Sequence, residues 1–145
     1  MSYYDRGNYS KKHSSFKKIN KKLAQIIKDR AKKGEIACAT AHAIADELGV
    51  DSSEIGFTID MLEIRIVKCQ LGLFGYNAPK KKILTPAEEV SEELKGEIKN
   101  AIEDGKISCE SIWNIAKKLG LKKMQVSSAC EALGIKITRC QLGAF

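Results

Sequence analysis

An internal repeat constrains this chain more than any other feature of its sequence. Shifting the sequence by 71 positions aligns residues 23–74 with residues 94–145 without a gap, and 18 of the 52 paired positions are identical. The match is closest at the end, where Cys-Gln-Leu-Gly-Leu-Phe at 69–74 pairs with Cys-Gln-Leu-Gly-Ala-Phe at 140–145. One structural unit therefore occurs twice. Because a unit of about 50 residues is marginally stable alone, we expect the copies to pack on each other or on a second chain.

The composition is that of a soluble globular protein. Of the 145 residues, 43% are hydrophobic and 30% are charged, which excludes disorder throughout. The N-terminus lacks the apolar stretch of a signal peptide, and no apolar run approaches the ~20 residues of a membrane span, so we expect a cytoplasmic protein. Its five cysteines cannot all pair within the chain, and we expect reduced thiols.

The net charge of +7 is unevenly distributed. Residues 1–33 carry +9, residues 34–75 carry −5, residues 76–93 carry −1 and residues 94–145 carry +4. Charges further apart than about 8 Å act separately at physiological salt. A partner would therefore meet a basic arm, an acidic module and a basic module.

The second copy opens with a helix signal. A capping box at Thr85–Glu88, with proline in the first helical position, predicts a helix that runs to about Asp104 and is ended by Gly105. The same offset places the cap of the first copy at Ser14 or Ser15. In that copy the apolar side chains recur with helical periodicity, at Phe16, Ile19, Leu23, Ile26 and Ile27.

The later elements of both copies follow one order. The first copy has an extended segment at 35–38, helices near 39–48 and 52–62 and a strand at 64–67, and the second has equivalents at 106–109, 110–119, 123–133 and 135–138. We expect a disordered basic tail over 1–13, a first module over 14–75, a linker over 76–84 and a second module over 85–145.

The turn between the last two helices of each copy carries a shared pattern. Ile115 and Ala116 are followed by Gly120, Leu121 and Val126, as Ile44 and Ala45 are by Gly49, Val50 and Ile55. Alanine lets the helices cross closely, and glycine takes the positive φ of the turn. With the element order, this pattern resembles the winged helix-turn-helix family. The resemblance implies a mainly α (α+β) fold of two tandem winged-helix-like modules. The second copy departs from the family after Cys140, where the five remaining residues allow at most a stub of a wing.

In that family the helix after the turn lies in the major groove of DNA. In the second copy it begins Lys122-Lys123-Met124-Gln125. A lysine at the start of a helix opposes the helix dipole and costs roughly 0.3–1 kcal/mol of stability. A phosphate bound there would contact both the ammonium groups and the free backbone N–H donors, so the same lysines would favour binding. The candidate nucleic-acid-binding residues are Lys122, Lys123, Gln125, Ser127 and Ser128, with Lys136 and Arg139 on the terminal strand. The alternative is that these lysines are ordinary solvated charges.

The first copy has the opposite character at this helix, which begins Asp51-Ser52-Ser53-Glu54. The carboxylates form an acidic cap and disfavour duplex binding, so we expect a homodimer or protein contact, with Phe57 facing the partner or else packing internally. The preceding helix is basic, through residues that include Lys17, Lys18, Lys21 and Lys22. It could follow a nucleic-acid backbone or lie on an anionic membrane; we favour the backbone and expect no membrane partner.

Four cysteines recur between the copies, namely Cys38, Cys69, Cys109 and Cys140. Thiolates suit a zinc site, an iron–sulfur cluster or a redox switch, but none of these has a C-x₂-C partner, and buried cysteine is commonly a small apolar residue. Cys130 replaces Ile59 and is expected in the core. Strand alternation places Cys69 out of phase with Ile64 and Ile66 unless a bulge intervenes.

No catalytic arrangement is visible. His42 stands alone on a helix, with Trp113 at the matching position, and we expect neither enzyme activity nor a cofactor. The sequence favours a DNA-binding transcriptional regulator or accessory nucleic-acid-binding protein that uses the second module and the basic N-terminal helix, with DNA rather than RNA as the partner. The alternatives are a protein–protein adapter with degenerate helix-turn-helix modules and a thiol or metal sensor.

Overall fold

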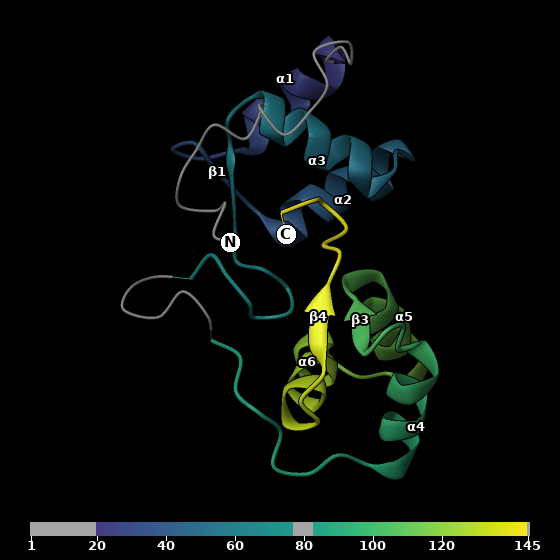
Figure 1. Cartoon of the computed structure of the whole chain (residues 1–145). Coiled ribbons are helices and arrows are strands. Elements are labelled where there is room, and N and C mark those ends of the chain that lie inside the picture. The colour runs from purple at the N-terminus through teal and green to yellow at the C-terminus, as the bar shows by residue number, and fades with distance from the viewer. Residues whose placement is uncertain (1–19, 77–82, 145) are drawn as a thin grey trace. The chain divides into compact units, whose positions relative to one another are not determined.

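The computed structural model describes residues 20–76 and 83–144 (Figure 1). The tail over 1–13, the candidate caps at Ser14 and Ser15, and Lys17 and Lys18 lie outside these residues. The first copy forms α1 (Lys21–Arg30), β1 (Glu35–Ala37), α2 (Cys38–Leu48), α3 (Ser52–Met61) and β2 (Arg65–Val67). The second forms α4 (Glu92–Ala101), β3 (Lys106–Ser108), α5 (Cys109–Leu119), α6 (Lys123–Ala132) and β4 (Lys136–Thr138). The fold is therefore mainly helical with short strands, as predicted.

The described residues form two compact units whose boundaries differ from the predicted modules. Unit 1 contains residues 20–69 and 74–76 together with 141–144, and unit 2 contains residues 83–140 together with 70–73. Each unit therefore includes part of the repeated Cys-Gln-Leu-Gly motif from the other copy. The sequence periodicity could not predict this exchange, because the motif is the same in both copies.

The first helix of each copy begins at a capped residue that the sequence analysis missed. Asn20 caps α1 by accepting hydrogen bonds from the backbone N–H groups of Lys22 and Leu23, both at 3.1 Å. Ser91, at the equivalent position, caps α4 by accepting from the N–H of Leu94 at 3.1 Å. The helix start predicted at Thr85 is wrong, because residues 85–90 are not helical and the N–H of Ala87 donates to the carbonyl of Ser128 at 3.0 Å.

The predicted end of α4 is also wrong. The helix ends at Ala101, and Ile102 is already extended, with φ −71° and ψ 134°. Gly105 does have a positive φ of 75°, but it serves the turn into β3, where Glu103 and Lys106 exchange backbone hydrogen bonds of 2.8 and 3.0 Å. This closed turn stops the helix earlier than a glycine stop alone would.

The turn predicted between the last two helices of each copy is confirmed. Gly49 and Gly120 cap α2 and α5 in the left-handed conformation, with φ of 63° and 67°. Ala45 and Ala116 are 5% and 3% exposed, which lets the paired helices pack closely. Ile55 on α3 and Val126 on α6 are completely buried. Ile27 on α1 and its equivalent Ile98 on α4 are also completely buried, in the cores of their units.

The strands pair in parallel within each unit. Ile36 pairs with Ile66 in β1–β2, and Ile107 with Ile137 in β3–β4. A parallel pair needs a crossover, which the two helices between the strands supply. Lys68, at φ 53°, then interrupts the strand alternation, so that Cys69 is buried on the same side as Ile66. No further strand follows β2 or β4 in the described residues, so neither copy builds a wing of paired strands there.

The exchanged motifs bury their leucines against the third helix of each unit. Within unit 1, a Cβ added to Gly56 of α3 would lie 1.9 Å from the carbonyl oxygen of Leu142, so only glycine fits there. Within unit 2, the equivalent residue, Ser127 of α6, donates a hydrogen bond from Oγ to the carbonyl of Leu71 at 2.9 Å. Leu71 and Leu142 are 0% and 2% exposed. The repeated motif is therefore a packing element.

The third helix of unit 1 is enclosed over most of its length. Residues 55–60 of α3 are all buried, and Phe57 is only 2% exposed. Of the two alternatives for Phe57, the structure agrees with internal packing and not with a partner-facing side chain, because Phe57 is buried inside unit 1. In the described part of the chain, no helix combines the length and the apolar character needed to span a bilayer.

Candidate nucleic-acid interface

Lysines gather where α5 ends and α6 begins in unit 2. We call Lys117, Lys118, Lys122 and Lys123 the basic tip. At the end of α5 a lysine complements the helix dipole, but at the start of α6 it opposes it, and α6 has no acidic residue in its first turn. The first turn of α6 therefore keeps an excess of positive charge.

Lys122 is the most available cation of the tip. It occupies the N-cap position of α6, is exposed and forms no ion pair with any described residue. Its backbone N–H donates to Oε1 of Gln125 at 2.7 Å. Gln125 is exposed but already occupied by this capping contact, so its amide must leave the cap before it reads a base edge.

The remaining lysines of the tip differ in how they are held. Lys123 is half-buried, with its Nζ 4.2 Å from the ring centroid of Trp113 on α5, a cation–π contact. Lys118 pairs with Glu97 of α4, its Nζ 2.8 Å from a carboxylate oxygen. Lys117 is exposed and has no ion pair in the described part of the chain. Lys117 and Lys122 are therefore the free charges of this surface.

Beyond its first turn, α6 is mostly buried. Val126, Ser127, Ala129 and Cys130 are buried, and only Ala132 is exposed. The prediction that Ser127 binds nucleic acid is wrong, because its hydroxyl is buried and bonded to Leu71. Ser128 is half-buried, and its carbonyl accepts the N–H of Ala87 from the segment before α4. The start of α6, with Lys122 and Gln125 exposed, is therefore more open to a large ligand than the rest of the helix.

The other predicted contacts are exposed but lie away from the tip along the chain. Lys136 begins β4, and Arg139 follows it at a positive φ of 52°. Lys21 and Lys22 are exposed in the first turn of α1, in unit 1. The structure therefore brings together Lys122, Lys123 and Gln125, while the predicted arm is represented only by its last residues.

The equivalent turn of unit 1 is acidic. Asp46, Glu47 and Asp51 are exposed where unit 2 has Lys117, Lys118 and Lys122. Asp51 occupies the N-cap of α3 as predicted, but its side chain makes no capping hydrogen bond. Carboxylates at this turn repel phosphates, so the candidate interface belongs to unit 2 alone.

The recurring cysteines are packed side chains. Cys38, Cys69 and Cys109 are buried and Cys140 is half-buried, and the described residues contain no group of three or more metal-ligating side chains. Burial raises the pKa of the Cys130 thiol to about 11. Tyr76 donates its hydroxyl to the carbonyl of Cys69 at 2.6 Å, and burial, together with the nearby Cys69 and Cys38 thiols, raises the pKa of Tyr76.

Sequence reasoning missed Lys117, Lys118 and Trp113 as parts of this surface. The lysines could have been found by pairing the copies, because they stand opposite Asp46 and Glu47 in the repeat alignment. The Trp113–Lys123 contact carries no local signal, since it joins two helices. Comparison of the chain with protein families, with curated proteins and with solved structures returns no match.

Proposed function

We propose that this protein is an accessory nucleic-acid-binding protein that holds the phosphates of duplex DNA at the basic tip of unit 2. The observation that carries the proposal is Lys122, an exposed cation at the N-cap of α6 that no described residue pairs. A phosphate at this position would accept backbone N–H donors and meet the ammonium groups of the tip.

The expected binding is insensitive to base sequence. A recognition helix reads bases by lying in the major groove, which requires an exposed face several residues long. On α6 that face is covered around Ser127, and Gln125 is occupied by the cap. Phosphate contacts by Lys117, Lys122 and Lys123 fix position without reading sequence. The lysines of the N-terminal arm would add to the same electrostatic term.

Exchanging the charge of the tip tests this function. In the full chain, Lys122→Glu combined with Lys123→Glu should weaken binding of a fluorescent 20-base-pair duplex by at least about tenfold and reduce the salt slope of the affinity by about 2. The matched control is Lys99→Glu with Lys106→Glu, which changes the net charge equally on α4 and β3. Equal affinity of both double variants would overturn the proposal, because only net charge would then matter.

Unit 1 supports a second function, contact with a protein. The exposed carboxylates Asp46, Glu47 and Asp51 surround its turn and suit a basic partner or a second copy of the chain. Asp46→Lys with Asp51→Lys should then shift the mass measured by light scattering toward the monomer. An unchanged mass, at concentrations where the wild type is larger than a monomer, would exclude self-association through this turn.

A further inference from the structure

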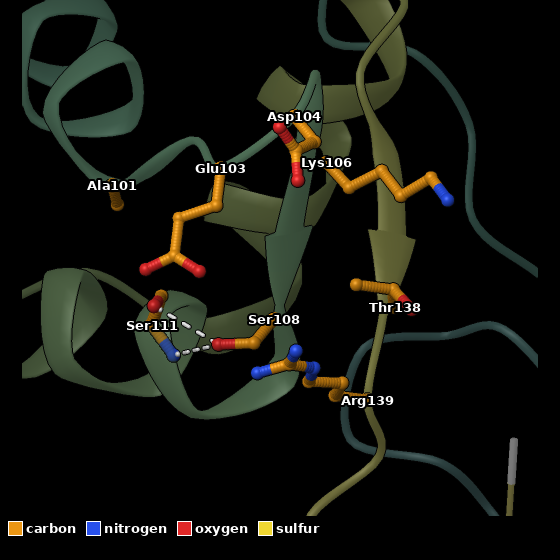
Figure 2. Close-up of a pocket in the computed structure, with 8 residues that line it drawn as sticks. All are labelled: Ala101, Glu103, Asp104, Lys106, Ser108, Ser111, Thr138 and Arg139. Carbon is orange, nitrogen blue, oxygen red and sulfur yellow. Dashed lines mark hydrogen bonds between the residues drawn. The ribbon is translucent and has the colours of Figure 1, made fainter.

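Unit 2 contains a polar cavity at the N-terminal end of α5, whereas the basic tip lies at the C-terminal end of that helix. The cavity has a volume of about 250 Å³ and lies between the end of α4, strand β3, the start of α5 and the end of β4 (Figure 2). Because α5 has 11 residues, the tip lies about 16 Å away along its axis. The cavity is therefore separate from the surface proposed to bind phosphates.

Opposite charges face each other across this cavity. Glu103 and Asp104 line it from the turn after α4, and the cations that line it are Lys106 on β3 and Arg139 after β4. Figure 2 shows the Glu103 carboxylate pointing toward Ser111 and the Arg139 guanidinium pointing toward Ser108. Among the described residues, no oppositely charged group lies within 4.0 Å of the Glu103 carboxylate or the Arg139 guanidinium, so neither side chain has a counter-ion there.

The hydroxyl groups between these charges are fixed in place. Ser108 Oγ accepts the backbone N–H of Ser111 at 3.1 Å and donates to Ser111 Oγ at 3.0 Å. Since the Ser111 hydroxyl accepts this bond, its own proton remains to be donated to a ligand. The cavity thus offers an anionic group, a cationic group and an oriented hydroxyl donor.

The first copy shows which of these features belong to the fold and which to the cavity. Lys33 and Lys68 have the same positive φ, 52° and 53°, as Asp104 and Arg139 with 51° and 52°, so the backbone conformation is common to both units. The side chains are not. Lys32 and Ala37 replace Glu103 and Ser108. Thr40 keeps a hydroxyl at the position of Ser111, so the Glu103 carboxylate and the Ser108 hydroxyl are the features particular to unit 2.

We propose that this cavity binds a small zwitterion, a molecule of amino-acid size with one ammonium and one carboxylate group. The ammonium group pairs with Glu103, and the carboxylate pairs with Arg139 and accepts the Ser111 hydroxyl. A ligand with both charges satisfies both sides of the cavity at once, whereas a singly charged ligand leaves one side without a counter-ion. The volume, at the small end of ligand pockets, suits a compact metabolite.

Amide NMR spectra of the full chain test the ligand class. Titration with glycine, L-serine or L-valine to about 20 mM should shift the resonances of Ser108, Ser111 and Arg139, with saturation for at least one of the three. Sodium acetate and methylammonium chloride are the singly charged controls and should give at least about tenfold weaker effects. Absence of saturable shifts with all three amino acids, or equal effects of the controls, would overturn the proposal.

Substitutions locate the ligand. Glu103→Gln and Arg139→Gln should each weaken binding of the responding amino acid by about tenfold or more, while the equivalents in unit 1, Lys32→Gln and Lys68→Gln, should not. Retained dispersion of the spectra shows that each variant is folded. Unchanged affinity in both cavity variants would overturn the proposal. Glu103→Gln should leave the Lys122-dependent duplex affinity unchanged, so failure of this site and failure of the proposed DNA contact are distinguishable.

Discussion

The two helix turns of this protein have the same backbone and opposite charges. Gly49 and Gly120 take nearly identical left-handed conformations, and the apolar residues behind them are buried in the same way. The exposed charged residues around Gly49 are carboxylates, and those around Gly120 are lysines. The buried positions of a repeat are held by packing, whereas its exposed positions are free to diverge, so the fold does not require the charge of either turn.

The contact between the helices at this turn also changes its chemistry. In unit 1, Ser52 Oγ and His42 Nδ1 lie 3.2 Å apart and share a hydrogen bond. In unit 2, the equivalent pair is Lys123 and Trp113, joined by a cation–π contact at 4.2 Å. The first residue of α3 or α6 therefore touches the same place on the preceding helix in both units. The lysine of unit 2 is kept near the tip by this contact.

The largest effect is expected from the equivalent core residues Ile27 and Ile98. Both are completely buried, so Ile27→Ala and Ile98→Ala should each lower the free energy of unfolding of its unit by about 2–5 kcal/mol. Urea denaturation followed by circular dichroism measures the loss. Ile83→Ala is the control, because that side chain is 42% exposed and should change stability by less than about 0.5 kcal/mol. A loss in only one of the two core variants would break the equivalence of the units.

The next effect concerns the exchanged motifs. Gly56→Ala should destabilise unit 1 by about 1–3 kcal/mol, because the added Cβ would lie 1.9 Å from the Leu142 carbonyl oxygen and the segment must move. Gly96→Ala on α4 is the matched control, since no atom lies within 4 Å of its added Cβ and alanine favours the helix. Denaturation curves compare the two. Unchanged stability of Gly56→Ala would show that residues 141–144 leave α3 in solution.

Much of the fold could be predicted from the sequence because its signals are local. The glycines of the turns, the small alanines and the β-branched runs placed α2, α3, α5 and α6 and all the strands within a residue or two. These elements depend on propensity and on a backbone conformation that glycine adopts without strain. The existence of two similar units follows from the repeat itself.

The errors lie where distant residues decide the outcome. Thr85–Glu88 has the composition of a capping box, yet Ala87 bonds to Ser128 far along the chain, and the helix begins at Glu92 instead. Ser127 was predicted to be exposed because it follows the tip by one turn, but Leu71 covers it. Hydrogen bonds between residues 41 and 56 positions apart leave no local pattern in the sequence.

A smaller effect is expected from giving unit 1 the charge of unit 2. Asp46→Lys with Asp51→Lys places cations where unit 2 has Lys117 and Lys122. If the tip binds phosphates through exposed charge, this variant should bind duplex DNA several-fold more tightly, with a salt slope steeper by up to about 2. Fluorescence anisotropy at several salt concentrations measures both. No change in affinity would mean that the backbone of α6, and not its charge alone, distinguishes the units.

The smallest effect is expected from the ion pairs that join the first two helices of each unit. In unit 1, Arg30 on α1 lies 2.7 Å from Glu47 on α2, and its hydrogen bond and charge lower the pKa of that carboxyl group. In unit 2 the two charges change places, because the carboxylate of Glu97 lies on the first helix, α4, and the cation of Lys118 lies on the second, α5. A lowered folded-state pKa stabilises the protein above the unfolded pKa of Glu47, and this contribution disappears as the pH falls through the folded pKa.

Glu47→Gln should therefore flatten the loss of stability with acidification, and the flattening should shrink with added salt, because both side chains are exposed. Thermal unfolding between neutral pH and the acidic range measures it. Asp29→Gln on α1 is the control, since among the described residues its carboxyl group accepts a hydrogen bond only from Gln25 on the same helix. If both variants flatten the acid limb equally, general charge and not the Arg30 contact sets the pH dependence, and the ion pairs cannot be what distinguishes the two units.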